Sequence, residues 1–318
     1  MIDFRYHVVS IIAVFLALGT GIVLGSTALD RPIIDDLKRR TEGLSQDKEE
    51  QQEEILQLKD RESQAREFAT GVGSVLLPGR LTGQRVTVVL TPSASGDVRD
   101  SVLAAVRLAG GRVGGQIRLL PKLIDPAAAG EVDELVAKLA TGIDPPSGTV
   151  PRAAAQLAAV LDAEGAADTA AVPADTVRVV SGYREAGLIA VEGDGPVRPG
   201  DVVLMIAGAP EDERRGSPSP STSSDPLLDV VTAFAGRGAV VLVGDEEATA
   251  EGALLPAVRD DSTLRTRLST VDSAGTPAGD VVTVLVLADA LRRDFGHYGT
   301  APGASAPLPA PEPEPAPA

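Results

Sequence analysis

Side chains that could catalyse a reaction or bind a transition metal are scarce in this sequence of 318 residues. It has no cysteine, two methionines (Met1 and Met205) and two histidines (His7 and His297). Soft transition-metal ions prefer thiolate and thioether ligands, followed by imidazole, and these four residues form no CxxC, MxxM or histidine cluster. No GxSxG surrounds a serine, and no HExxH is present. The sequence therefore predicts a non-enzymatic protein with no catalytic, cofactor-binding or metal-binding residues of its own.

Two loops are weaker candidates for a binding site. Thr91–Gly96 follows an apolar strand and opens into a helix, whose N-terminus could bind an anion. This loop lacks both the GxGxxG and the P-loop pattern, so capping of the helix by Ser95 or Asp97 is the favoured interpretation. Three carboxylates at 245–247 also follow a strand and could coordinate a hard cation, but a helix N-terminus that attracts acidic residues explains them equally well.

The charge and composition limit the possible partners and the type of core. The net charge of −16 argues against a nucleic-acid partner, because phosphate binding needs a concentrated basic surface. Hydrophobic residues make up 43% of the chain but aromatic residues only 3%, so the core must rest on Ala, Val and Leu.

The first 29 residues predict a membrane anchor. Tyr6–Leu29 contains no charged residue over 24 positions, and as a helix it would be about 36 Å long, enough to cross a hydrocarbon core of roughly 30 Å. A cleaved signal peptide is the alternative, because Ser26-Thr27-Ala28 has small residues at a suitable spacing. The weakly basic start and the length of the apolar run favour an uncleaved single-pass anchor in the lipid bilayer.

One face of this segment has small residues at every fourth position: Ala13, Ala17, Gly21 and Gly25. Such a face lets two helix backbones approach closely, and Gly21 and Gly25 form a GxxxG motif. The pattern predicts a dimerisation face within the membrane, although glycine and alanine are common in membrane helices in general.

Residues 30–70 predict a coiled-coil stalk. Seam positions recur at spacings of three and four, with charged residues between them. The large apolar residues of this seam are Ile34, Leu37, Leu44, Ile55 and Leu58; its other positions are Thr41, Lys48, Gln51, Glu62, Ala65 and Ala69. The polar positions Lys48, Gln51 and Glu62 interrupt the apolar pattern and could fix the register and the number of helices. A homodimer is the favoured interpretation, and a lone charged helix that packs on its own domain is the alternative.

Pro32 predicts a break or a kink between anchor and stalk, and Gly71–Gly73 predicts the end of the stalk.

Residues 71–297 predict an α/β body with a mainly parallel, Rossmann-like sheet. Fully apolar strands alternate with amphipathic helices, which is typical of a sheet covered on both faces. The expected strands are 85–90, 112–120, 201–207 and 239–243, and the expected helices are 97–109, 130–141, 152–163, 226–235 and 280–295, the last with Asp280 as its N-cap. Residues 298–318 are rich in proline and alanine and predict a disordered tail.

Two stretches resemble a known family. MIDFRYHVVSIIAVFLALGTGIVLGS at the start and TVDSAGTPAGDVVTVLVLADALRRDFGHYG near the end are similar to the mycobacterial copper transport protein family, the MctB-like proteins of actinobacteria. The resemblance covers nearly the whole chain apart from the tail. It implies a cell-membrane protein with its body outside the cytoplasm and a role in copper transport or homeostasis. Copper is therefore expected only because the resemblance implies it, and no cofactor is predicted from the residues.

The same resemblance implies a second possible role. Some members are linked to cell-envelope assembly and division through a membrane partner that resembles thiamine pyrophosphokinase. Two hypotheses therefore stay open at this point: participation in copper export or tolerance, and a dimeric scaffold that regulates envelope assembly.

Overall fold

The computed structural model of the chain describes residues 4–139, 146–162, 171–193, 195–210 and 226–310, with backbone only at 4–5, 26–43 and 45–47. The chain forms two compact units, Met1–Ala65 and Arg66–Ala318. The first unit is helical throughout its described part, and the second contains the sheet.

A single α-helix, α1, spans Phe4–Leu76. The predicted break at Pro32 is wrong, because the helix runs through this residue: a proline removes one backbone hydrogen bond and bends a helix, but the turns on either side can still form. The alternative, a kink at Pro32, stays a prediction. The predicted end at Gly71–Gly73 is also wrong. Gly73 is buried, and a Cβ atom there would lie 2.9 Å from Val281 Cγ2, so glycine lets the helix pass close to this neighbour.

The second unit is built on a seven-stranded sheet in the order β3-β2-β1-β4-β5-β6-β7. All neighbouring strands are parallel except β2 and β3, which are antiparallel. β1, β4 and β5 are buried over nearly their whole length, as their unbroken apolar sequences predict. The strands are β1 Arg85–Leu90, β2 Arg112–Leu119, β3 Ile189–Glu192, β4 Val202–Ile206, β5 Ala239–Val243, β6 Ser269–Val271 and β7 His297–Tyr298.

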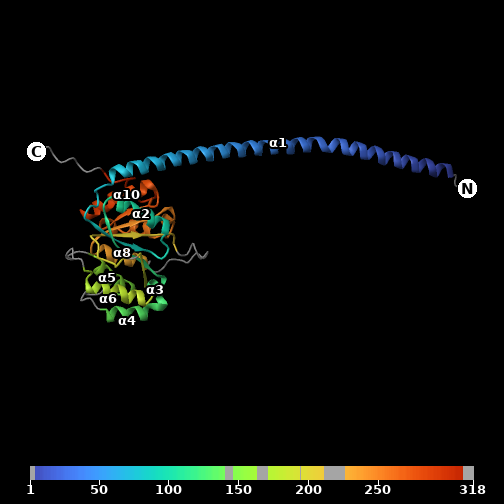
Figure 1. Ribbon diagram of the computed structural model, residues 1–318. Coiled ribbons are helices and arrows are strands. Elements are labelled where there is room, and N and C mark those ends of the chain that lie inside the picture. The colour runs from blue at the N-terminus through green and yellow to red at the C-terminus, as the bar shows by residue number, and fades with distance from the viewer. Residues whose placement is uncertain (1–3, 140–145, 163–170, 194, 211–225, 311–318) are drawn as a thin grey trace. The chain divides into compact units, whose positions relative to one another are not determined.

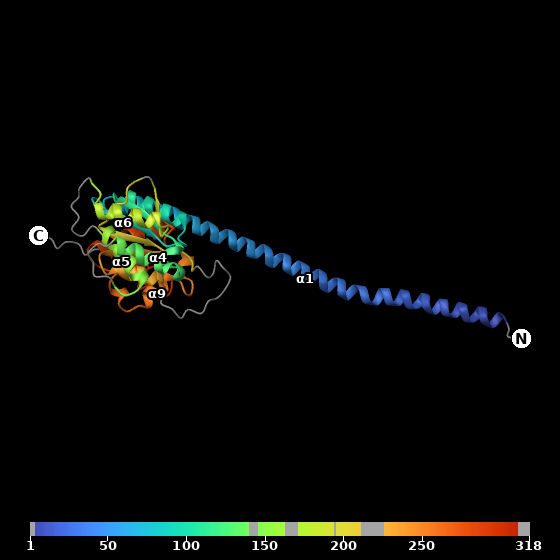
Figure 2. The same cartoon turned by 90° about the horizontal axis from the view of Figure 1, so that it is seen from below.

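Helices cover both faces of the sheet, so the second unit has three layers (Figure 1). On one face, α2 (Gly96–Leu108) and α10 (Pro277–Leu291) pack over side chains such as Val88 and Leu204. The other face carries α3 (Pro121–Ile124), α4 (Ala129–Lys138), α5 (Thr149–Leu161), α6 (Ala174–Glu185), α8 (Pro226–Ala235) and α9 (Leu254–Asp260), several of which are labelled in Figure 2. Short 3-10 turns occupy η1 (Pro126–Ala128), η2 (Glu246–Thr249) and η3 (Leu264–Thr266).

The α/β class and the mainly parallel sheet are confirmed, whereas two boundaries need correction. Thr276, not Asp280, caps α10: its hydroxyl accepts a hydrogen bond from the Gly279 amide at 3.0 Å, and Pro277 follows in the first turn. The predicted disorder does not apply to residues 299–310, because the chain after β7 is held by hydrogen bonds such as Gly299 N to Ala306 O at 3.0 Å. Residues 311–318 of the predicted tail lie outside the described residues. The Rossmann likeness stays a prediction.

Candidate functional site

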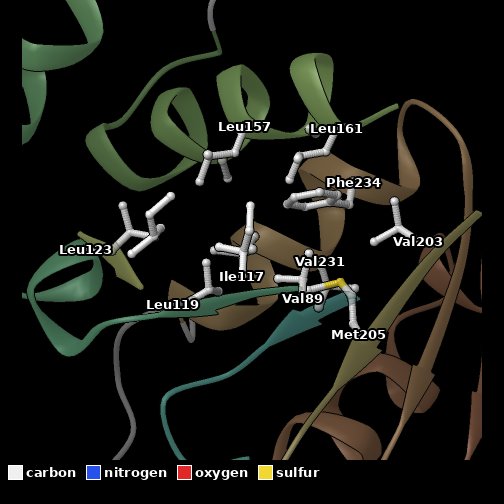
Figure 3. Close-up of a cluster of buried hydrophobic side chains, with 14 of the residues drawn as sticks. Val89, Ile117, Leu119, Leu123, Leu157, Leu161, Val203, Met205, Val231 and Phe234 are labelled. Carbon is white, nitrogen blue, oxygen red and sulfur yellow. The ribbon is translucent and has the colours of Figure 1, made fainter. Parts of the chain in front are cut away.

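Met205 and His297 lie on different strands of the sheet, β4 and β7, and His7 belongs to the other unit. Met1 lies outside the described residues, and His7 is exposed on α1. Met205 on β4 is 1% exposed and packs in the core among Val89, Val203 and the α8 residue Val231 (Figure 3). Its thioether therefore fills apolar space, as the sequence predicts for a residue in a core strand.

His297 on β7 is also buried, and both of its ring nitrogens have partners. Nε2 lies 3.1 Å from the Arg265 carbonyl oxygen, and since a carbonyl only accepts, Nε2 carries the proton. Nδ1 then accepts from the Thr270 hydroxyl at 3.0 Å, while that hydroxyl accepts from Arg259 Nε at 2.9 Å. Burial lowers the pKa of His297, and the charges of Arg259 and Arg265 lower it further against the opposing hydrogen bond to the Arg265 carbonyl. The imidazole is thus a neutral structural group with no free nitrogen for a metal.

Arg259 and Asp272 form the most deeply buried ion pair among the described residues. Arg259 Nη1 lies 2.9 Å from Asp272 Oδ2, and the two side chains are 2% and 0% exposed. The other carboxylate contacts come from backbone amides: Thr300 N at 2.9 Å from Oδ1 and Ala301 N at 3.0 Å from Oδ2. Gly299 is required here, because its φ is +129° and a Cβ atom would lie 1.8 Å from Asp272 Oδ1.

Arg259 also binds the chain that follows β7. Its Nη1 donates to the Pro302 carbonyl at 3.2 Å, and its Nη2 donates to the Tyr298 carbonyl at 3.0 Å. This network is missing from the sequence-based expectations, because β6 has only three residues and the tail is predicted to be disordered. The signal that could have found it is Asp272 directly after the short stretch Leu268-Ser269-Thr270-Val271. We name Arg259, Thr270, Asp272 and His297 the C-terminal network, and its satisfied contacts make it structural.

Contacts within the protein hold both candidate loops of the sequence. Asp245 Oδ1 accepts from the Ala248 amide at 3.2 Å and so caps a 3-10 turn, which agrees with one of the two explanations for these acids, the attraction of a helix start for carboxylates. In the loop Thr91–Gly96, Arg118 Nη1 donates to the carbonyls of Thr91 at 3.3 Å and Ala94 at 3.0 Å. Gly208 lies so close to this loop that a Cβ atom would be 2.2 Å from the Ser93 carbonyl oxygen. The expected cap at Ser95 has no side-chain hydrogen bond.

Among the described residues, Asp280 is the one carboxyl group whose pKa is raised strongly by its surroundings. It is 8% exposed in the first turns of α10, and burial raises its pKa to about 6 against the hydrogen bonds from the Gly275 amide and Ser101. The bond from Gly275 N is 2.9 Å long. No group of three metal-ligating side chains (His, Cys, Asp, Glu) occurs among the described residues, so Asp280 is not part of a described cation site.

The dimer-face residues occupy the part of α1 that could cross a membrane. Over Tyr6–Gly25 the helix is long and apolar enough for this, and none of it is buried in the structure. A Cβ atom added at Gly21 or Gly25 would meet no atom within 4 Å beyond the helix's own backbone. In the seam, Leu44, Ile55 and Leu58 are 70%, 51% and 55% exposed; the side chains of Ile34 and Leu37 lie outside the described part. Most of the large apolar side chains that are exposed in the described part of the chain lie on α1.

Comparison with known proteins decides the family. A family model described as "Copper transport outer membrane protein, MctB" matches residues 1–309. The chain belongs to the MctB family. The copper transporters MctB of Mycobacterium tuberculosis (strain H37Rv) and Mycobacterium bovis are each 27% identical to it over 322 residues, which cover 96% of this chain and 98% of each relative. The copper transporter MctB of Mycobacterium leprae is 28% identical over 329 residues.

This member of the MctB family offers a poor set of donors for copper. A copper(I) site needs thiolate, thioether or imidazole ligands that converge on one point. Here Met205 is in the core, His297 has two hydrogen-bond partners, and cysteine is absent from the sequence. The described residues therefore do not fit a copper site within one copy of the chain.

Proposed function

We propose that this MctB family member is a non-enzymatic protein of the cell envelope that is anchored by a single membrane-spanning helix and supports copper transport or homeostasis through an assembly. The observation that carries the proposal is the exposed apolar segment Tyr6–Gly25, in a chain whose family match begins at residue 1. The copper part of this proposal rests on the names of the family and of its mycobacterial relatives. The buried thioether of Met205 and the two partnered ring nitrogens of His297 support an indirect role.

The anchor and its orientation can be tested together, because the natural chain has no cysteine. Leu108 on α2 is 50% exposed, so a Leu108→Cys variant provides a single reactive thiol on the body. We expect the protein to stay in the membrane pellet after alkaline carbonate extraction, and the thiol to react with a membrane-impermeant maleimide in intact cells. Release into the supernatant would contradict the anchor, and labelling only after lysis would place the body in the cytoplasm.

The proposal includes a parallel homodimer through α1. In such a dimer Leu44 meets Leu44 of a second copy, because seam positions of the two helices face each other. A Leu44→Cys variant should form a disulfide-linked dimer in oxidised membranes. Leu56 is a matched control: it is 63% exposed but lies outside the seam, so Leu56→Cys should crosslink far less. Equal crosslinking of both variants would argue against the coiled coil.

The membrane segment allows an equivalent comparison. Gly21→Ile should weaken dimerisation in a bilayer, because a large side chain keeps the two backbones apart. Gly19→Ile adds the same side chain two residues away, on the opposite side of the helix, and should have little effect. A reporter of helix association in membranes measures both variants. Unchanged association of the Gly21→Ile variant would contradict the proposed dimer face.

We expect that a single copy of this chain does not coordinate copper directly. Titration of the purified full-length protein with copper(I) in a calorimeter should show no specific binding at micromolar metal. Met205→Leu, which preserves apolar volume, should titrate as the natural chain does. Tight stoichiometric binding would overturn the indirect role and would call for donors shared between copies.

A dimeric scaffold for envelope assembly is the second candidate, and the exposed seam of α1 favours it. Such a scaffold would act through a membrane partner, for which a protein resembling thiamine pyrophosphokinase is the hypothesis. Deletion of the gene separates the two candidates. Cells that accumulate copper and become sensitive to it support the first, whereas cells that separate abnormally at a normal copper content support the second.

A further inference from the structure

The edge strand β3 and the groove beside it form a surface to which neither role assigns a purpose. Among the described strands, β3 pairs with β2 alone and is the outermost strand on its side of the sheet. Leu188 O accepts from Leu120 N at 2.9 Å, and the register pairs Leu119 with Ile189. Because inward and outward groups alternate in an antiparallel pair, the backbone N–H and C=O groups of Ile189 and Val191 face away from β2.

These outward groups have no described strand to pair with. Unpaired edge groups are a template for an added strand, and proteins commonly protect them when no partner is intended. β3 carries neither a proline nor a lysine, and three of its four residues are apolar: Ile189, Ala190 and Val191. Its charged residue, Glu192, is held by Arg99 and by Arg118, the latter with its Nε 2.6 Å away.

A groove runs beside this strand. It lies between α6 and the chain around β3, and its walls include Val177, Val180, Arg184, Val191, Pro196 and Val197. Its volume of about 170 Å³ is well below the roughly 300–1,000 Å³ of pockets that hold whole small molecules. The groove therefore suits a few side chains of a larger partner better than a free ligand.

The charge at the groove limits what that partner can be. Arg184 is exposed at the groove, and it takes part in none of the ion pairs between described residues. The whole chain has a net charge of −16, so an exposed cation beside an apolar groove is a local exception. A carboxylate on the partner would complement it.

We propose that β3 and this groove bind an extended segment of a partner protein, which adds a strand at the outer edge of β3. Strand addition uses backbone hydrogen bonds for affinity and pockets for alternate side chains for specificity. Here the bonds come from Ile189 and Val191, apolar side chains at alternate positions of the partner fill the groove, and an acidic residue faces Arg184. The proposal is independent of copper and of the dimer through α1.

A selection from random nonapeptides tests this proposal on the full-length protein in detergent micelles. We expect enriched peptides to carry apolar residues at alternate positions and an acidic residue. Arg184→Glu should shift the selection from acidic to basic residues. Binding of an enriched peptide should also slow amide exchange in the segment 186–193.

Two matched variants locate the bound peptide. Val177 on α6 is 52% exposed at the groove, and Leu108 on α2 is 50% exposed on the other face of the sheet. Val177→Lys should weaken binding at least tenfold, whereas Leu108→Lys should leave it unchanged, and neither change empties the core.

Three outcomes would overturn the proposal. The first is a selection with no alternating pattern, including one that enriches helical spacing. The second is equal binding to the Val177→Lys and natural proteins. The third is protection of 186–193 that rises with protein concentration in the absence of peptide, because a second copy would then occupy the edge.

Discussion

The two ends of the sheet hold their charged groups in different ways. Near β6 and β7, Arg259 and Asp272 are almost fully buried, and the chain from 298 to 302 supplies four backbone partners. Near β2 and β3, Glu192 lies between Arg99 and Arg118, and these three side chains are 20–24% exposed. The first arrangement is closed over by the protein's own chain, and the second is left partly open to solvent.

This difference indicates how much each end of the sheet contributes to the stability of the fold. A buried ion pair is costly to break, because the remaining charge has neither water nor a partner. A partly exposed pair keeps some hydration when one partner is lost, so its net contribution is small. The β7 end should therefore dominate stability, while the β3 end can exchange partners at little cost.

The largest effect should come from the buried pair. Asp272→Ala leaves the Arg259 guanidinium buried without its carboxylate, and we expect the free energy of unfolding to fall by about 3–5 kcal/mol. Urea denaturation followed by circular dichroism measures the loss. Asp272→Asn, which keeps the shape and an acceptor oxygen, should lose less. A loss below about 1 kcal/mol for Asp272→Ala, as is typical of exposed pairs, would remove the distinction between the two ends.

The pH dependence should show two opposing buried groups. The pKa of His297 is lowered, so the unfolded chain takes up a proton below about pH 6.5 that the native protein does not, and stability falls on acidification. The pKa of Asp280 is raised from 3.8 to about 6, so the native protein takes up its proton first. Asp280 therefore stabilises the fold as the pH falls from 6 towards 3.8, by up to about 3 kcal/mol.

Two variants separate these contributions. In Asp280→Asn the free energy of unfolding should fall more steeply as the pH is lowered from 7 to 5, because the stabilising protonation of Asp280 no longer offsets the effect of His297. His297→Gln keeps a donor for the Arg265 carbonyl. In this variant the free energy of unfolding should rise as the pH falls over part of the same range, because only Asp280 then takes up its proton. Urea midpoints at pH 5, 6 and 7 measure both slopes, and identical slopes in the two variants would contradict the assignment.

The sequence predicts the central sheet better than its edges. β1 and β5 have the predicted bounds, because continuous runs of Val and Leu are typical of strands buried on both faces. β6 and β7 have three and two residues, too few for any periodicity, and tertiary hydrogen bonds decide their position. The apolar run that contains β3, residues 188–191, is too short for its pattern to decide between strand and helix, and pairing with β2 makes it a strand.

The polar networks are harder to predict than the strands. Arg259 and Asp272 are 13 residues apart in sequence and look like ordinary surface residues until the fold buries them. The absence of a cysteine or histidine cluster, in contrast, follows from composition alone. Sequence can therefore exclude the usual copper ligands within one copy, but it cannot show that His297 is neutral and enclosed.

The smallest effect should come from the open end, and it should depend on salt. Burial alone would raise the pKa of Glu192, but the hydrogen bonds and charges of Arg118 and Arg99 outweigh it, so the pKa lies below its usual value. Glu192→Gln keeps the size of the side chain and removes the charge. We expect a loss of about 0.5–1 kcal/mol in dilute buffer, which shrinks in high salt because partly exposed charges are screened.

The matched measurement is Asp272→Asn under the same two salt conditions. Its effect should hardly change with salt, since a pair with 2% and 0% exposure is out of reach of most ions. A salt-independent loss at Glu192 as large as that at Asp272 would mean that the β3 end is closed in solution. In that case a neighbouring molecule would already cover the edge that we propose for an added strand.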